Sequence, residues 1–311
     1  MKILITGIHG FVGGNLVKRF GQDHEIYGLD IVAPNKNGII KTYSWDDLDK
    51  GLIEPVDAIV HLAGKAHDLK KTAGAEIYFQ VNTGLTQKIY DWFLKSGAKK
   101  FIFFSSVKAA ADFVPGDILT EDVVPNPVGP YGESKIKAEE YILNHLSEEK
   151  QVYILRPCMI HGPGNKGNLN LLYGVVKKGI PWPLGAFENR RCFTSIGNLE
   201  FVIHGLLTKD VESGIYNMCD DEPLSTNELI GVICQALGKK AHIWHLSKGL
   251  MMGIAKIGDT LHLPLNSERI TKLTENYVVS NAKIKKALGV RQMPIRAEEG
   301  LIRTIQSFVN N

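Results

Sequence analysis

The stretch Thr6-Gly7-Ile8-His9-Gly10-Phe11-Val12-Gly13 decides the fold of this 311-residue chain. It lies between a short apolar run, Lys2 to Ile5, and a segment whose apolar side chains recur at helical spacing. Gly7 permits a tight turn, Gly10 lets the backbone approach a pyrophosphate, and Gly13 allows close packing of helix on strand. Free N–H groups at the helix N-terminus can then bind the anion. The stretch predicts a strand, a turn and a helix that bind a dinucleotide; a glycine-rich turn without a ligand is the alternative.

The rest of the first half alternates short apolar runs with amphipathic segments. This alternation is typical of βαβ units, so we expect an α/β fold with a doubly wound parallel sheet of the Rossmann type. Apolar side chains four residues apart indicate two of the helices, at Val12, Leu16 and Phe20 and at Ala138, Ile142 and Leu146. The expected strands are Lys2 to Ile5, Glu25 to Asp30, Asp57 to Leu62, Lys100 to Ser105, Val152 to Arg156 and, more weakly, Ile39 to Tyr43.

The pattern changes after about residue 160, where glycine and proline become dense and helical segments dominate. We expect residues 1–160 to form the dinucleotide-binding domain and residues 161–311 to form mainly a substrate-binding region, with some segments returning to the first domain. Ser225 to Glu228 is a capping-box pattern, and Gly238 is a helix stop. A helical stripe is predicted to be a packing face, at Leu250, Met251, Met252, Ile254 and Ile257.

Composition excludes several classes of protein. Hydrophobic residues make up 44% and charged residues 22%, which is typical of a folded globular chain. The formal net charge of +3 gives little attraction to nucleic acid or to a membrane surface, and neither is an expected partner. The four cysteines are widely spaced, which argues against a disulfide framework and a zinc knuckle and favours the cytoplasm. No signal peptide, membrane span or metal site is predicted.

Asp30 closes the second expected strand, 17 residues after Gly13. A carboxylate at that position can accept hydrogen bonds from the adenosine ribose hydroxyls, and it would repel a 2′-phosphate. The predicted cofactor is therefore NAD rather than NADP, although Lys36 lies nearby and a solvated aspartate at a strand end is the alternative reading.

A second group of residues points to proton transfer. Tyr131 and Lys135 are one helical turn apart, in a helix expected to continue through Glu149. A phenol has a pKa of about 10, so it becomes a useful base near neutral pH only where a nearby cation stabilises the phenolate. The pair alone is a weak signal. Ser106 strengthens it, because the carboxyl end of its strand faces the ligand crevice of a doubly wound sheet.

Taken together, these residues resemble the extended short-chain dehydrogenase/reductase family of nucleotide-sugar epimerases, dehydratases and reductases. The resemblance covers nearly the whole chain, and its specificity comes from the order and spacing of the pieces. The matching elements are Thr6-Gly7-x-x-Gly10-x-x-Gly13, Asp30, His61 to Gly64, Asn82, Ser105-Ser106, Tyr131-x-x-x-Lys135, Arg156-Pro157 and Gly162-Pro163-Gly164.

The resemblance implies a role for each matching residue. Tyr131 would be the acid/base, Lys135 would tune it and hold the nicotinamide ribose, and Ser106 would bind the reacting oxygen. The implied cofactor contacts are Gly7, Gly10, Phe11, Val12, Gly13, Asp30, Leu62, Ala63, Gly64, Asn82, Ser105, Tyr131, Lys135 and Pro157. The implied substrate contacts are Ser106, Lys108, Asn168 and Arg191, with the Arg191 guanidinium meeting the diphosphate of a UDP-sugar.

Departures from the family pattern reduce the number of reactions that we expect this chain to catalyse. Dehydratases carry an Asp-Glu pair after the serine position, whereas Val107 and Lys108 stand here, so dehydration is not expected. Common 4-epimerases carry Val-Tyr-Gly a few residues on, where this chain has Ala109 to Ala111. The chain most resembles a bacterial subgroup that includes 4-keto reductases of UDP-N-acetyl-6-deoxyhexoses in surface-polysaccharide synthesis.

We therefore expect hydride transfer at C4 of a UDP-sugar, a UDP-N-acetylhexosamine derivative above all. A 4-epimerase and a 4-ketoreductase remain open, because both use the same residues. A non-catalytic dinucleotide-sensing protein on the same fold is the rival from another class. The resemblance also implies a homodimer through the helices after Ala75 and Tyr131.

Overall fold

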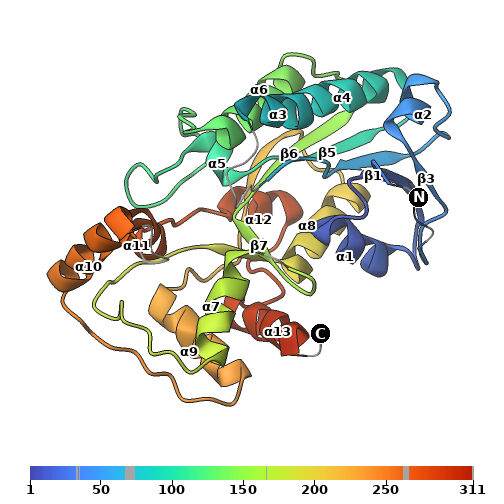
Figure 1. Ribbon diagram of the computed structural model, residues 1–311. Helices are drawn as coiled ribbons and strands as arrows, with labels where there is room; N and C mark the ends of the chain where they lie inside the picture. Colours follow the sequence, from blue (N-terminus) through green and yellow to red (C-terminus); the bar gives the residue numbers. More distant parts are fainter. Residues whose placement is uncertain (33, 35, 67–73, 166, 262–265, 310–311) are drawn as a thin grey trace.

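A seven-stranded parallel sheet forms the centre of the molecule (Figure 1). The computed structural model describes residues 1–32, 34, 36–66, 74–165, 167–261 and 266–309. The strand order is β3-β2-β1-β4-β5-β6-β9, so the order reverses between β1 and β4, where a doubly wound sheet binds its ligand. The strands are β1 (Lys2–Thr6), β2 (Glu25–Leu29), β3 (Lys41–Tyr43), β4 (Ala58–His61), β5 (Lys100–Phe104), β6 (Gln151–Pro157) and β9 (Gly214–Met218).

The fold class and six of these strands were predicted from the sequence, and the structure confirms them. The seventh, β9, comes from the later half of the chain and pairs with β6 from Tyr153 to Pro157. Only one face of its Gly214–Met218 segment is strongly apolar, so its sequence did not stand out among the neighbouring helices. The strand shows that the later half of the chain returns to the first sheet.

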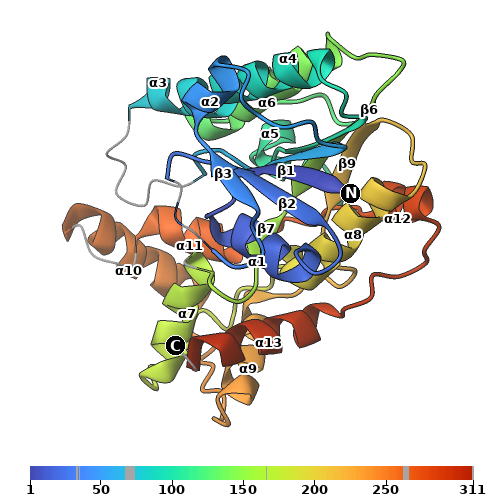
Figure 2. The same cartoon turned by 90° about the vertical axis from the view of Figure 1, so that its right-hand side faces the viewer.

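Helices cover both faces of the sheet (Figures 1 and 2). Buried side chains are almost continuous along the central strands, as a sheet covered on both sides requires. One face carries α1 (Phe11–Phe20), α8 (Ile196–Thr208) and α12 (Ala282–Leu288). The other carries α2 (Trp45–Asp49), α3 (Ala75–Tyr78), the π-helix η1 (Phe79–Gly84), α4 (Leu85–Lys95) and α6 (Pro130–Leu143). The short helix α5 (Val107–Ala110) follows β5 directly.

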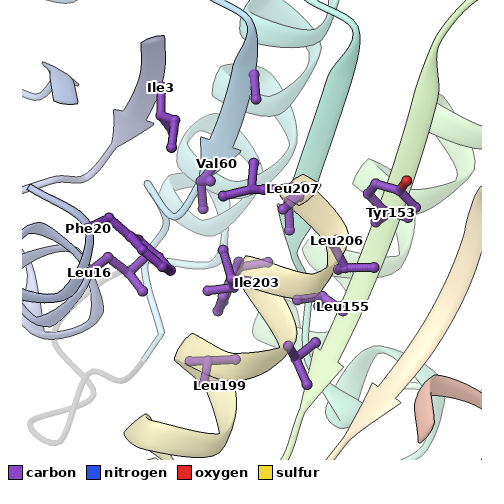
Figure 3. Close-up of a cluster of buried hydrophobic side chains, with 14 of the residues drawn as sticks. Ile3, Leu16, Phe20, Val60, Tyr153, Leu155, Leu199, Ile203, Leu206 and Leu207 are labelled. Carbon is purple, nitrogen blue, oxygen red and sulfur yellow. The ribbon is translucent and has the colours of Figure 1, made fainter. Parts of the chain in front are cut away.

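The packing of α8 shows what holds these layers together. Its side chains Leu199, Ile203 and Leu206 are fully buried between the sheet and α1 (Figure 3). Phe20 of α1 and Val60 of β4 lie in the same apolar cluster. Each such aliphatic side chain contributes about 1.5–3 kcal/mol when fully removed from water. This cluster therefore fixes a helix from the second half of the chain against the dinucleotide-binding half.

The remaining elements form a second lobe with its own apolar cluster. Its small parallel sheet pairs β7 (Met159–His161) with β8 (Phe193–Ser195). Ser225 and Glu228 form the predicted capping box of α9, and Gly238 follows that helix with φ +63°. The helices of this lobe are α7 (Asn168–Lys177), α9 (Thr226–Ala236), α10 (Lys248–Leu261), α11 (Ser267–Thr274) and α13 (Ala297–Val309).

Two expectations about helices were wrong. Helix α6 ends at Leu143 instead of continuing through Glu149, and Leu146 lies on the surface. The chain must turn there to enter β6 at Gln151, and Asn144 and Ser147 favour turns over a helix interior. Of the stripe predicted to pack, Met251 is buried, but Leu250, Ile254 and Ile257 are exposed. None of the described helices is both long and apolar enough to cross a lipid bilayer.

Candidate active site

The glycine-rich turn joins β1 to α1 in the way the sequence predicts. Gly7 has φ +66°, and a Cβ atom there would lie 2.9 Å from the amide nitrogen of Ala63. A Cβ on Gly13 would lie 2.5 Å from the carbonyl oxygen of Ile8 and 2.7 Å from that of Gly7. The close approach at Gly13 is therefore between the helix and carbonyls of its own turn. No side chain fits at either position without displacing backbone.

Asp30 lies directly after β2 and holds this turn. One carboxylate oxygen accepts a hydrogen bond from the His9 amide at 3.0 Å, and the other accepts one from the Ile31 amide at 2.7 Å. A carboxylate offers about four acceptor positions, so these two bonds leave capacity for ribose hydroxyls. Burial lowers the pKa of His9, and Lys36 lowers it further, so the imidazole beside Asp30 is held toward its neutral form.

A buried chain of hydrogen bonds fixes the end of β4. His61 Nδ1 lies 2.6 Å from Thr6 Oγ1, and its Nε2 lies 2.9 Å from Thr86 Oγ1. The Thr6 hydroxyl also accepts a hydrogen bond from the Ala63 amide at 3.0 Å. Burial, with Lys135 as a second cause, lowers the pKa of His61 well below its usual value. A neutral imidazole thus joins three elements and sets the course of the backbone at Ala63.

Asn82 connects that segment to α6. Its amide oxygen accepts from the Lys65 N–H at 2.8 Å, and its amide nitrogen donates to the Lys65 carbonyl at 3.1 Å and to Ser134 Oγ at 2.9 Å. A Cβ on Gly64 would lie 3.0 Å from the Asn82 oxygen and 3.1 Å from Lys135 Nζ. Gly64, Asn82 and Lys135, three separate predictions from the sequence, therefore meet at one place.

Ser106 and Tyr131 also come together, which is the central prediction of the sequence. Ser106 caps α5, where its Oγ accepts from the Lys108 amide at 3.2 Å, and it is hydrogen-bonded to the Tyr131 hydroxyl. Burial raises the pKa of Tyr131, and the hydrogen bond from Ser106 opposes that rise. The apposition depends on Gly132, because a Cβ there would lie 2.5 Å from the Lys108 carbonyl oxygen.

Lys135 lies one turn further along α6, almost completely buried. Its ammonium group donates to the Phe104 carbonyl at 2.7 Å and stands 4.9 Å from the centre of the Phe103 ring. Burial lowers its pKa to about 8, and the charge of Glu139 works against that fall. At neutral pH the side chain thus keeps most of its positive charge beside Gly64.

Behind Lys135 lies a buried ion pair that was not predicted from the sequence. Glu139 accepts from Arg156 Nε at 3.0 Å and from its terminal nitrogen at 2.5 Å. The same carboxylate accepts a hydrogen bond from the Ser105 hydroxyl. Both charged side chains are at most 1% exposed. The signal was present, because Glu139 follows Lys135 by one helical turn, so the two share a face of α6.

Two of the predicted substrate residues, Lys108 and Arg191, lie near Tyr277 at the boundary between the lobes. Lys108 Nζ stands 4.4 Å from the centre of the Tyr277 ring and 3.2 Å from the Asp112 carboxylate. The Tyr277 hydroxyl donates to the Ala111 carbonyl at 2.6 Å. Arg191 is half-buried and pairs backbone groups with Leu224. This ring therefore joins the second lobe to helix α5 and the residue that follows it.

The Arg191 guanidinium is already engaged. It donates to the Lys272 carbonyl at 2.5 Å and lies 3.6 Å from the Glu275 carboxylate. A diphosphate at this position would share the guanidinium with these two groups. Asn168 begins α7, and its side chain lies outside the described part of the structure.

Comparison with known proteins identifies the family. The model of the "NAD dependent epimerase/dehydratase family" matches residues 3–219. A UDP-glucose 4-epimerase of Vibrio cholerae is 30% identical over 99% of this chain and 95% of the relative. The chain belongs to this family. Its members depend on NAD, so NAD is its cofactor.

Two further known proteins are similar to this chain. An Escherichia coli O157:H7 protein named N-acetyl-α-D-glucosaminyl-diphospho-ditrans,octacis-undecaprenol 4-epimerase is 29% identical over 98% of this chain and 94% of its own. The crystal structure of a UDP-glucuronic acid 4-epimerase from Bacillus cereus, in complex with NAD, superposes with a TM-score of 0.76 at 19% identity, covering 100% of this chain and 99% of that one. The second likeness concerns the fold.

The residues present fit NAD. The crowded glycine positions leave the turn without side chains, Asp30 keeps acceptor capacity, and Lys135 places a cation beside Gly64. Two other predicted contacts lie near the same edge of the sheet: a Cβ on Gly162 would lie 3.5 Å from the Phe11 ring, and Pro157 ends β6. Val12 and Leu62 are half-buried against the core. Ser105 differs, because its hydroxyl donates to Glu139 and its amide donates to the Leu155 carbonyl, which leaves only its oxygen atoms as acceptors for the cofactor.

Proposed function

We propose that this family member is a 4-epimerase of a UDP-linked N-acetylhexosamine used in surface-polysaccharide synthesis. The observation that carries the proposal is the hydrogen bond between Ser106 and Tyr131, with the Lys135 ammonium one turn along the same helix. A hydroxyl pair at the carboxyl end of β5 can hold the O4 atom of a sugar between a proton donor and a proton acceptor.

Each residue of this set has its own role in the proposed reaction. Tyr131 takes the proton from O4 and later returns it, while Ser106 donates a hydrogen bond that keeps O4 and the phenol aligned. Lys135 supplies the positive charge that makes the phenolate accessible, because burial alone raises the Tyr131 pKa. NAD, held by the glycine-rich turn, Asp30 and Lys135, would supply the hydride chemistry at C4. Epimerisation then requires only that the sugar turn its other face before the hydride returns.

Epimerisation is preferred over the other outcomes of this chemistry. The Vibrio cholerae and Escherichia coli relatives named above are both 4-epimerases, and each matches nearly the whole length of this chain. A ketoreductase would use the same residues but consume reduced cofactor. A dehydratase needs an acid and a base beside the serine, where Val107 and Lys108 stand. A non-catalytic sensor has no need of the Ser106, Tyr131 and Lys135 set.

The substrate assignment rests on the boundary between the lobes. Lys108 and Arg191 are two half-buried cations near Tyr277, and two such cations suit a diphosphate. We assign the diphosphate of a UDP-sugar to them. A sugar diphosphate carried on a polyprenol, as in the name of the Escherichia coli relative, presents the same charged group and is the second candidate.

Incubation of the purified protein with UDP-N-acetylglucosamine tests the proposal. We expect UDP-N-acetylgalactosamine to appear without net oxidation of NADH. Tyr131→Phe removes the acid/base and should lower kcat by about 10²–10⁴-fold with NAD binding retained. Tyr173→Phe is the matched control, since the Tyr173 hydroxyl is buried without a described hydrogen-bond partner. Net consumption of NADH with a 4-keto sugar would show that the protein is a reductase and not an epimerase. A fully active Tyr131→Phe protein would refute the role of Tyr131 as acid/base.

A homodimer remains part of this proposal. The helices after Ala75 and Tyr131 expose Ile77 on α3 and Leu143 at the end of α6. Apolar side chains on neighbouring helices can form a four-helix contact between two copies. Sedimentation equilibrium of the wild-type protein and of Ile77→Lys/Leu143→Lys tests it, because two added charges should shift the chain toward the monomer.

A further inference from the structure

Helix α10 carries an apolar stripe that no described residue covers. Leu250, Ile254, Ile257 and Leu261 are between 40% and 61% exposed. Their spacing of four, three and four residues places all four within a sector of about 60° on the helix. The buried side of the same helix, with Met251 and Ala255, packs into the second lobe. The helix is thus apolar over two adjoining faces, of which the protein buries one.

Positive charge is concentrated on the other sides of α10 and on the segment that leads into it. The segment from 239 to 261 contains four lysines and one aspartate, so it alone carries an excess equal to the formal net charge of the chain. The lysines, at 239, 240, 248 and 256, are all exposed. Trp244, in the same segment, exposes about half of its surface. The low charge of the whole chain, from which no membrane partner was expected, conceals this local concentration.

Aliphatic side chains along one strip of a helix, lysines elsewhere on it and an exposed tryptophan nearby are the composition of an interfacial membrane helix. The aliphatic groups enter the boundary between headgroups and acyl chains, while the lysines bind anionic headgroups. We propose that α10 docks this protein on an anionic membrane surface through Leu250, Ile254, Ile257 and Leu261.

A second copy of the chain fits the stripe less well. Two copies in a symmetric contact would pair the apolar stripe with itself, which would give no role to the exposed Trp244 or to the local excess of lysines. The dimer expected from the sequence also uses other helices, those after Ala75 and Tyr131. A lipid surface instead supplies negative charge and an apolar layer together, which matches both features of α10.

The position of α10 connects membrane docking to the proposed substrate site. Helix α10 packs against α11 (Figure 1), and the chain after α11 brings Glu275 to Arg191 and Tyr277 to the end of α5. The docking helix therefore belongs to the rim of the proposed substrate site. This connection, by which the protein would reach a sugar diphosphate carried on a lipid, rests on the proposed function; the docking itself does not.

Co-sedimentation of the full chain with vesicles tests the proposal. We expect binding to vesicles that contain phosphatidylglycerol, weak binding to pure phosphatidylcholine, and loss of most binding at roughly 0.5 M salt, where the Debye length falls below 5 Å. The variant L250S/I254S/I257S should bind the anionic vesicles more than about tenfold more weakly. The control I40S/L52S/L146S changes three equally exposed aliphatic residues on other elements and should bind as the wild type does.

Three outcomes would overturn the proposal: no sedimentation of the wild type with anionic vesicles, equal sedimentation of the stripe variant, or a stripe variant that loses an oligomer instead of lipid binding in sedimentation equilibrium. Circular dichroism confirms that each variant is folded. Turnover of a water-soluble UDP-sugar by both variants separates this result from the proposed function, since α10 contributes no residue to the catalytic set.

Discussion

The two halves of the site are built differently. On the dinucleotide side, polar groups are buried and bonded to one another: His61 bonds two threonines, Asn82 makes three hydrogen bonds, and Glu139 binds both Arg156 and Ser105. On the substrate side, the cations Lys108 and Arg191 are half-buried and bond to nearby carbonyls and carboxylates.

This difference corresponds to two tasks, proton transfer on the dinucleotide side and substrate binding on the other. A proton-transfer site requires fixed atoms, and a buried network in which every member is bonded fixes them. A binding pocket for one sugar among many can rely on side chains that exchange one oxygen partner for another. Changes on the first side should therefore affect stability and pH dependence, whereas changes on the second should affect KM.

Glu139→Gln should give the largest effect. It removes one charge of a buried ion pair and leaves Arg156 uncompensated, which costs about 3–5 kcal/mol in the free energy of unfolding. It also removes the carboxylate that holds up the Lys135 pKa, so the alkaline limb of the pH–rate profile should move to lower pH. Urea denaturation and kcat measured against pH report the two effects.

Glu140→Gln is the control for that change, because Glu140 is the next residue and is exposed. The double variant Glu139→Gln/Arg156→Gln removes both charges and should recover part of the stability while keeping the shifted pH profile. A pH profile of the double variant identical to that of the wild type would show that the Glu139–Arg156 pair supports only the fold.

Lys135→Met should raise stability while abolishing activity. The folded-state pKa of Lys135, about 8, lies below the usual 10.5. Below pH 8 the lysine is charged in both states, and the native state carries the full cost of burying it. The cost disappears as pH rises toward 10.5, so the stability gain of the variant, about 3 kcal/mol at pH 7, should shrink across that range.

Lys137→Met is the matched control on the same helix, since Lys137 is exposed. It should show no comparable gain at pH 7 and no loss of kcat. If Lys135→Met is instead less stable than the wild type at pH 7, the hydrogen bond to Phe104 outweighs the burial cost.

The sequence alone predicted the dinucleotide side well, for a physical reason. Parallel strands are buried on both faces, so their apolar runs are visible without knowing their neighbours. Gly7 and Gly13 are required by local backbone geometry, which a short motif encodes. A tyrosine and a lysine four residues apart are common on helices, so Tyr131 and Ser106 were brought together by the position of Ser106 at the carboxyl end of a parallel strand, and the family resemblance then gave each a role.

The remaining features depend on contacts between distant parts of the chain. Arg191 meets Glu275 across 84 residues, and no periodicity indicates such a pair. The end of α6 at Leu143 depends on where β6 must begin. For α10, hydrophobic spacing revealed the apolar positions, but only the packing against the second lobe shows that Met251 is covered and Ile254 is not.

Gly13→Ala tests the rigidity of the dinucleotide side. The added Cβ would meet two backbone carbonyls at 2.5 and 2.7 Å, so the turn must shift, at a cost of about 1–3 kcal/mol. Gly14→Ala adds the same atom one residue later with nothing within 4 Å, and it should stabilise the helix by about 0.5–1 kcal/mol. Thermal unfolding with and without NAD should show weaker stabilisation by NAD in the first variant alone.

Arg191→Met should give the smallest effect and the cleanest separation of the two sides. Loss of a charge-assisted contact to the diphosphate should raise KM for the UDP-sugar about tenfold, because bonds to charged groups contribute about 1.5–3 kcal/mol. NAD binding and the pH profile should stay as they are, since Arg191 has no contact with the Glu139 network among the described residues. Arg190→Met, on the exposed neighbouring residue, controls for loss of surface charge. A change in kcat without a change in KM would place Arg191 in the fold between the lobes, through its bond to Glu275, and not at the substrate.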